Sequence, residues 1–197
     1  MRQPAFLGIL NALAALLAML AGAAVVLLSL LIVFDITARS LFRFSLQGTD
    51  ELGGYTLALI GSLGLSCTLL QRAHPRIDIV LRHFPLRLRA VLHVVAYAAM
   101  SGFAIFMTWH GVTEFRETLA YGTVTNTPLQ TPLWMPQVLW ISGTVFFAVT
   151  TVICTLHAGW LLVAGEPDAL EAAYGTPSVA DEVQEYVGEQ PAATEQG

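Results

Sequence analysis

Residues 39–85 read RSLFRFSLQGTDELGGYTLALIGSLGLSCTLLQRAHPRIDIVLRHFP, and this stretch decides the fold. The acidic pair Asp50 and Glu51 precedes an uncharged stretch, residues 52–70, and a basic, histidine-containing segment, residues 71–78, follows it. A helix of about 20 apolar residues crosses the ~30 Å hydrocarbon core of a bilayer. The stretch therefore predicts one membrane-spanning helix with a charged boundary at each end.

The composition of the whole chain is typical of a membrane protein. Of its 197 residues, 55% are hydrophobic and 12% are charged, and the mean hydropathy is +0.66. An ordinary soluble domain carries about twice that share of charge. All nine basic residues are arginines that precede residue 166, whereas eight of the fourteen acidic residues lie at or beyond it. We therefore expect a lipid bilayer around residues 1–165, and no nucleic acid as a partner.

Four apolar stretches predict an all-α membrane protein with four transmembrane helices, at about residues 5–34, 52–70, 88–113 and 137–163. Connectors at 35–50 and 77–84 mix apolar residues with arginines, which favours amphipathic helices lying in the membrane interface. A cleaved signal peptide is an alternative for the first stretch, although signal peptides normally have an apolar core of only about 7–15 residues. The acidic tail, residues 166–197, has few apolar residues and is predicted to be disordered.

The arginines also predict the orientation of the chain in the membrane. Cytoplasmic loops are enriched in Lys and Arg. The connector at residues 71–89 holds five arginines, so we place it in the cytoplasm together with both termini and the tail. Six arginines then lie inside and three outside.

Small residues recur at helical spacing on the second span, at Gly54, Ala58, Gly61 and Gly64. Small side chains allow close approach of helices in lipid, so we expect this to be a helix-packing face. The first span carries a similar stripe, made of Ala14, Ala18 and Gly22.

Groups suited to catalysis or ligand binding are sparse. Apart from Arg89 at the edge of the third span, the spans contain no Asp, Glu, Lys or Arg, the residues that usually mark ion or proton paths. His93 and His110 could ligate haem, but only His93 has candidate second ligands near its side of the membrane, His157 and His74. We therefore expect no enzyme and no cofactor or metal. Two alternatives stay open: a haem-binding membrane enzyme and a small homo-oligomeric transporter.

Polar residues at the predicted membrane boundaries are the remaining candidates for interface contacts or structural pinning. They are Arg39, Asp50, Glu51, His74, Arg76 and Asp78. Carboxylates and arginines can form charge-assisted hydrogen bonds that hold a connector or a partner in place. We expect Arg39 to pair with Glu51 on the outer side and Arg76 to pair with Asp78 on the inner side. The alternative is that each residue only contributes solubilising charge at the interface.

Short motifs follow one another through these boundaries and spans. They are Arg39, Phe42, Ser45-Leu46, Gly48-Thr-Asp-Glu51-Leu52, Leu63-Gly64, His74-x-Arg76-x-Asp78, Leu81-x-x-x-Pro85, Thr131-Pro-Leu-Trp-Met-Pro136 and Gly143. Their order and spacing over roughly residues 10–160 resemble the small integral membrane subunit, or Q subunit, of tripartite ATP-independent periplasmic (TRAP) transporters. The chain differs from that pattern where Gln71-Arg-Ala replaces a glycine-containing turn, where Pro75 follows the histidine, and in its acidic tail.

This resemblance implies a scaffold subunit in a bacterial inner membrane. Such a subunit pairs with a large multi-span membrane subunit that carries substrate and sodium. A periplasmic substrate-binding protein delivers an organic acid or related solute to the complex. Sodium is therefore expected on the large subunit rather than on this chain.

Overall fold

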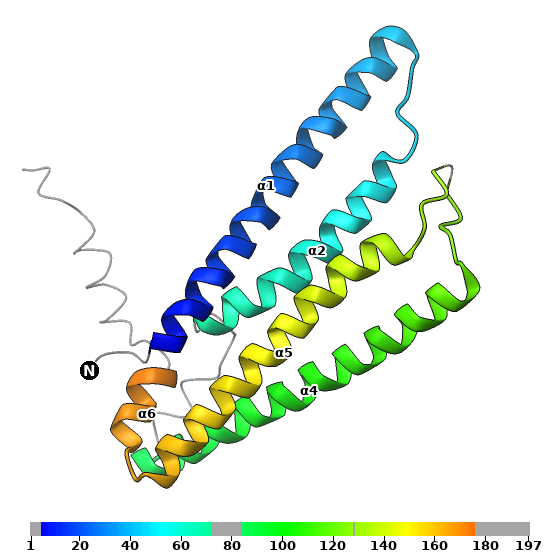
Figure 1. The fold of residues 1–197 in the computed structure, drawn as a ribbon. Helices are drawn as coiled ribbons and strands as arrows, with labels where there is room; N and C mark the ends of the chain where they lie inside the picture. Colours follow the sequence, from blue (N-terminus) through cyan, green and yellow to red (C-terminus); the bar gives the residue numbers. More distant parts are fainter. Residues whose placement is uncertain (1–4, 72–83, 128, 176–197) are drawn as a thin grey trace, which may run out of the picture.

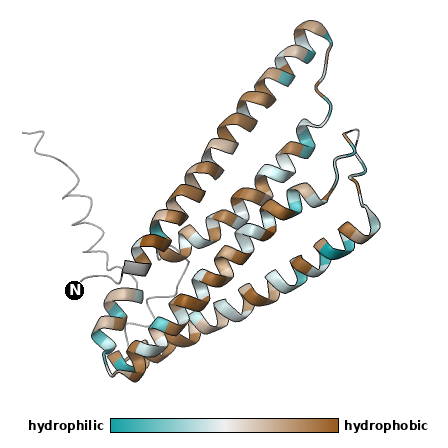
Figure 2. Ribbon diagram, viewed as in Figure 1, coloured by the Kyte–Doolittle hydropathy of each residue, from teal (hydrophilic) through white to brown (hydrophobic). Residues whose placement is uncertain are grey.

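The computed structural model describes residues 5–71, 84–127 and 129–175 (Figure 1). Its helices are α1 (Ala5–Phe42), α2 (Thr49–Leu70), α4 (Leu86–Tyr121), α5 (Trp134–Val163) and the short α6 (Pro167–Tyr174). The first four are long and apolar enough to cross a membrane. Figure 2 shows hydrophobic residues along these helices and more hydrophilic residues near their ends. The prediction of an all-α membrane protein with four spanning helices is confirmed.

The long helices lie side by side in the order α1, α2, α5, α4 (Figure 1). The extensive contacts join α1 to α2, α2 to α5, and α5 to α4. Two hairpin-like pairs are thus joined along α2 and α5. As a consequence, large hydrophobic side chains stay exposed on every long helix, among them Met19, Leu57, Phe103 and Leu156.

A regular stripe of less exposed residues runs along α1. Its members recur at alternating intervals of three and four residues: Leu7, Leu10, Ala14, Leu17, Ala21, Ala24, Leu28, Leu31, Asp35 and Ala38. This spacing matches the seam of two helices that pack at a shallow angle. We call it the α1 seam, and α2 is the long helix that α1 contacts extensively. Of the smaller predicted stripe, Ala14 is buried in the seam, whereas Gly22 is exposed.

The helix α1 extends beyond the first predicted span, residues 5–34. The helix α1 continues from Phe34 to Phe42, so the separate interfacial helix expected within residues 35–50 does not form. No glycine or proline interrupts residues 23–47, and Asp35 and Arg39 form an ion pair one turn apart. The helix ends just before Arg43, which has a left-handed backbone with φ 53°. The other expected interfacial helix, at 77–84, falls almost entirely outside the described residues.

The remaining boundaries also differ from the predicted ones. The helix α4 runs past residue 113 to Tyr121, where Gly122, at φ 61°, caps it by donating its backbone N–H to Thr118. The helix α5 begins at Trp134 rather than at 137. Threonine is a preferred N-cap residue, which would favour Thr49 at the start of α2. The N-cap residue is instead Gly48, with φ 97°. Charge on Glu114 and Glu117 did not end α4 because acidic residues are compatible with a helix.

The helices α2 and α5 approach each other closely at Gly143. A Cβ atom built on Gly143 would lie 2.5 Å from the hydroxyl oxygen of Ser62 and 3.0 Å from its backbone carbonyl carbon. Only a glycine therefore fits at this point of α5. The contact thus joins the two helix pairs.

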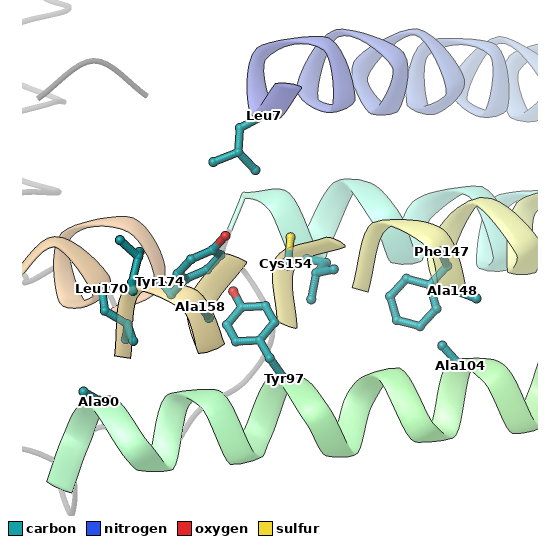
Figure 3. Close-up of a cluster of buried hydrophobic side chains, with 12 residues drawn as sticks. Leu7, Ala90, Tyr97, Ala104, Phe147, Ala148, Cys154, Ala158, Leu170 and Tyr174 are labelled. Carbon is teal, nitrogen blue, oxygen red and sulfur yellow. The ribbon is translucent and has the colours of Figure 1, made fainter. Parts of the chain in front are cut away.

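The buried core lies toward the end of the molecule where α6 packs (Figure 3). It combines residues from five helices, including Leu7, Leu69, Tyr97, Cys154 and Leu170. Leu170 is fully buried and Tyr174 is only 3% exposed. The prediction of disorder for the whole tail is therefore wrong for Pro167–Tyr174, because this segment buries an apolar face against α4 and α5. Residues 176–197 lie outside the described part of the chain.

Candidate functional site

Polar side chains gather at the end of the molecule opposite α6. Here the end of α1, the connector 43–48, the start of α2 and the α4–α5 loop meet (Figure 1). We call this site the polar junction and define it by Asp35, Arg39, Ser45, Glu51, Tyr55, Thr125 and Thr127. Two carboxylates organise it, one on α1 and one on α2.

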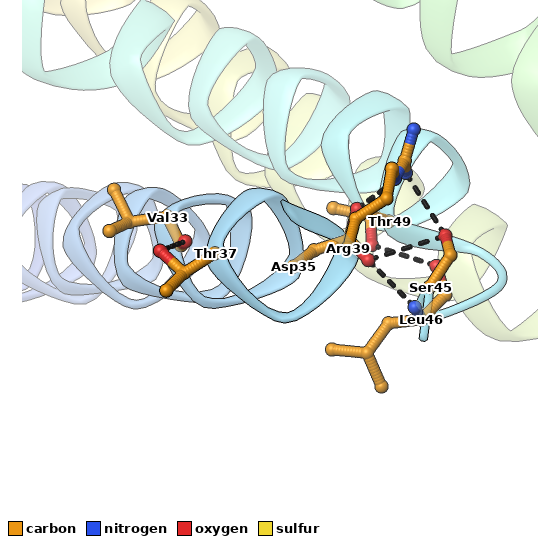
Figure 4. A network of polar contacts seen from close by, with 7 residues as sticks. All are labelled: Val33, Asp35, Thr37, Arg39, Ser45, Leu46 and Thr49. Carbon is orange, nitrogen blue, oxygen red and sulfur yellow. Dashed lines mark hydrogen bonds and ion pairs between the residues drawn. The ribbon is translucent and has the colours of Figure 1, made fainter. Parts of the chain in front are cut away.

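Asp35 fixes the connector to α1 (Figure 4). Its carboxylate accepts a 2.6 Å hydrogen bond from the backbone N–H of Leu46 and a 2.7 Å bond from Arg39. The hydroxyl of Ser45 lies 3.4 Å from the same carboxylate and 3.0 Å from the Arg39 guanidinium. Asp35 is only 3% exposed. A buried carboxylate is stable only when hydrogen-bond donors replace the water that it has lost. Because one of these donors is the Leu46 N–H, the interaction fixes the connector between α1 and α2.

Glu51 fixes the α4–α5 loop to α2. Its carboxylate accepts hydrogen bonds from Thr125 at 2.7 Å, from Thr127 at 2.5 Å, and from Tyr55 one turn further along α2. Glu51 is only 8% exposed. Hydroxyl groups from the loop that joins α4 to α5 thus satisfy a carboxylate on a helix of the other pair. The loop itself is closed by an isolated bridge between Val124 and Pro132.

Gly48 allows the loop to come this close. Its φ of 97° belongs to the left-handed region that favours glycine. A Cβ atom at this position would also lie 2.7 Å from a methyl carbon of Leu129. The Gly48-Thr-Asp-Glu51 motif therefore combines a turn, a close contact and a buried carboxylate in four consecutive residues.

The predicted pairing of Arg39 with Glu51 is wrong. Arg39 pairs with Asp35, whereas hydroxyl groups surround Glu51. Asp50 is exposed and, with Asp35 and Arg39, lines an open cleft of about 680 Å³ between the end of α1 and the start of α2. Both boundary acids of α2 thus lie at the polar junction, but only Glu51 is buried there.

The other predicted site residues divide into two groups. His74, Arg76 and Asp78 lie outside the described residues, so their roles and the pairing of Arg76 with Asp78 stay predictions. On the small-residue face of α2, Gly54 and Gly61 are exposed, and Ala58 and Gly64 are partly buried. Apart from the adjoining residues and nearby backbone of α2 itself, no described atom comes within 4 Å of a Cβ built on these three glycines. This face of α2 therefore stays open instead of packing on another helix of the chain.

The described residues show no arrangement typical of a metal centre. No group of three His, Cys, Asp or Glu side chains within residues 5–71, 84–127 and 129–175 is placed to hold an ion. Of the three histidines considered for haem near one face, the two within the described residues contact α6: His93 lies 3.3 Å from Glu171, and Nδ1 of His157 lies 2.6 Å from the hydroxyl of Tyr174. The polar junction can thus form and hold hydrogen bonds between segments, and we assign it that structural role.

Sequence reasoning missed Asp35, Tyr55, Thr125 and Thr127. The i,i+4 spacing of Asp35 and Arg39 was visible, but nothing local indicated that the Leu46 N–H would complete the site. Thr125 and Thr127 stand 74 and 76 residues from Glu51, so only the tertiary fold brings them together. The alternation of threonines within the turn-rich segment 123–127 was the one available signal.

Comparisons with known proteins identify the family of the chain. Neither the curated proteins nor the solved structures provide a match to the chain. A family model described as "Tripartite ATP-independent periplasmic transporters, DctQ component" matches residues 28–160. The match includes the whole polar junction and confirms the resemblance inferred from the motifs, and four apolar helices agree with an inner-membrane protein. Because it covers more than half of the sequence, the chain belongs to the family of DctQ components, the small membrane subunits of TRAP transporters.

Proposed function

We propose that the chain is the membrane scaffold of a TRAP uptake system. In this role it pairs with a large multi-span transport subunit, and together they receive an organic acid or related solute from a periplasmic binding protein. Uptake is driven by sodium, which binds to the large subunit. The chain itself transports nothing and catalyses no reaction.

The observation that carries this proposal is the open row of helices. The four spans contact in the order α1, α2, α5, α4 and leave large apolar side chains exposed on every one of them. The sequence has no Asp, Glu, Lys or Arg within the apolar stretches at residues 5–34, 52–70, 90–113 and 137–163. A row without internal charge provides wide lateral surfaces and little for an ion to bind. These properties suit a supporting subunit better than a coupled carrier.

The polar junction supports the same role. Asp35 ties the connector to α1, and Glu51 ties the α4–α5 loop to α2. Fixed loops at one end of a row of helices give a partner protein a defined surface. We propose that this end faces the periplasm and meets the binding protein, and that both termini lie in the cytoplasm. The distribution of arginines supports this orientation.

The orientation predicts which sites a membrane-impermeant maleimide reaches in intact cells. Both native cysteines are first replaced by serine, and N126C or A172C is introduced at an exposed position. In cells with a permeable outer membrane, N126C should react fully and A172C only after lysis. Labelling of A172C in intact cells would show that the chain has the opposite orientation.

The scaffold role is tested by expressing the tagged chain with its neighbouring genes and isolating it in mild detergent. A stoichiometric large membrane protein should be isolated with it, and uptake in proteoliposomes should require both membrane proteins, the binding protein and a sodium gradient. Charge reversal at Asp78 should reduce assembly or uptake. Transport by the chain alone would instead establish that it is a small homo-oligomeric transporter. A haem absorption band would establish that it is a haem-binding membrane enzyme.

A further inference from the structure

The helix α6 lies beyond the family match, which ends at residue 160. It packs at the end of the molecule opposite the polar junction, against α4 and α5 (Figure 1). It has eight residues, and isolated helices of this length are marginal in water. Its structure therefore depends on the surface that it covers.

A carboxylate on α6 faces two basic side chains on α4. Arg89 and His93 stand one turn apart, and the Arg89 guanidinium forms an ion pair with Glu171. The other oxygen of the Glu171 carboxylate lies 3.3 Å from Nε2 of His93, which adds a second ion pair when the imidazole is protonated. The exposed fraction is 27% for the Arg89 side chain, 4% for His93 and 20% for Glu171, so the contact is largely removed from solvent.

The last residue of α6 is held by aromatic and polar contacts. The Tyr174 hydroxyl lies 2.6 Å from Nδ1 of His157. Its ring meets that of Tyr97 edge to face, with centroids 5.0 Å apart. The thiol of Cys154 lies beside the same side chain (Figure 3). Cys154 is only 2% exposed, and α6 forms part of its cover.

We propose that Arg89 and His93 form a binding seat for a carboxylate carried on a helix, and that α6 occupies it through Glu171 as a latch. The latch closes over the start of α4 and the end of α5. Because α6 is too short to be stable alone, its release and its unfolding are one event. This inference does not depend on the proposed transport role, because it concerns contacts within the chain.

The reactivity of Cys154 reports whether the latch is open. The full-length protein in mild detergent is treated with a small uncharged maleimide, and modification at each cysteine is followed by mass spectrometry of peptides. Cys67, on α2, serves as an internal reference in the same sample. Glu171→Gln and Arg89→Gln should each raise the rate at Cys154 by about tenfold, because each leaves a partly buried charge without its partner.

Two controls separate the seat from general destabilisation. Glu166→Gln removes an exposed acid that precedes α6 and makes no side-chain cap, so it loses only a screened interaction with the helix dipole, and the Cys154 rate should rise far less than in the two seat variants. The double variant Arg89→Gln with Glu171→Gln should react no faster than the faster single variant, because both remove one contact. A rate of maleimide modification at Cys67 that is the same in all variants shows that the membrane helices stay packed.

Three results would overturn the latch. In the first, Glu171→Gln and Arg89→Gln behave like Glu166→Gln. In the second, the increases multiply in the double variant, which means that the two residues act separately. In the third, Cys67 accelerates in parallel with Cys154, which means that the whole helix layer has loosened.

Discussion

Gly143→Ala is expected to lower the stability of the protein by about 1–3 kcal/mol, because the added methyl group overpacks the contact between α2 and α5. That methyl carbon would lie 2.7 Å from Cβ of Ser62 and 3.0 Å from its carbonyl carbon. The backbone of α2 cannot rotate away as a flexible side chain does, so the two helix pairs must move apart. Thermal unfolding in detergent should show a lower transition temperature than that of the unmodified protein.

Gly159→Ala provides the matched control. It makes the same change on the same helix, at a position where the new Cβ meets no described atom within 4 Å apart from its chain neighbours and the nearby backbone of α5. Since alanine favours a helix more than glycine does, this variant should be unchanged or slightly more stable. Combining Gly143→Ala with Ser62→Gly should recover part of the loss, because two of the three closest atoms are then absent. Equal stability of the two alanine variants would show that the α2–α5 contact is not tight.

Glu51→Ala is expected to release the α4–α5 loop from α2. The hydroxyls of Tyr55, Thr125 and Thr127 lose a shared acceptor at once. Backbone amides of residues 123–133 should then exchange with solvent at least about ten times faster, since the loop opens without unfolding of the helices. Hydrogen exchange read by mass spectrometry measures the change directly. Under the proposed function, the same variant should bind the periplasmic binding protein more weakly.

The neighbouring acid gives the comparison for this variant. Asp50→Ala also removes a carboxylate from the first turn of α2, but from an exposed position. Both variants lose the same interaction with the helix dipole, so any difference between them belongs to the loop contacts. If the two exchange profiles coincide, Glu51 does not fix the loop.

Hydrophobic pattern was sufficient to predict the helices but not their ends. The apolar runs identified four spans because crossing a bilayer imposes a length and a composition on each helix. Their ends followed other causes: the Asp35–Arg39 pair continued α1, and Gly122 stopped α4. Charge alone was a poor marker of a boundary, because charged residues fit a helix that leaves the hydrocarbon region.

Of the polar junction, the sequence singled out Glu51 and Arg39, but not Asp35 or the hydroxyl groups that bind Glu51. Glu51 stood out because a carboxylate at the edge of an apolar run requires an explanation. Its partners could not be found locally, since they come from a loop more than 70 residues away. Glu171 was missed for a related reason: within an acidic tail it looked like solubilising charge, and only the folded chain places it against Arg89.

The α1 seam affects the register in which α1 packs on α2. Its members repeat with a period of seven residues, so a slide of α1 by one repeat, about 10 Å along its axis, would again place apolar residues along the seam. Leucine and alanine would exchange at most positions, so side-chain volume distinguishes the alignments, but apolar character alone does not. Asp35 occupies one of the repeating positions, and the bond from the Leu46 N–H forms in only one alignment. A single buried acid thus favours one apolar alignment of α1 over the others, as a lone polar residue does in a coiled coil.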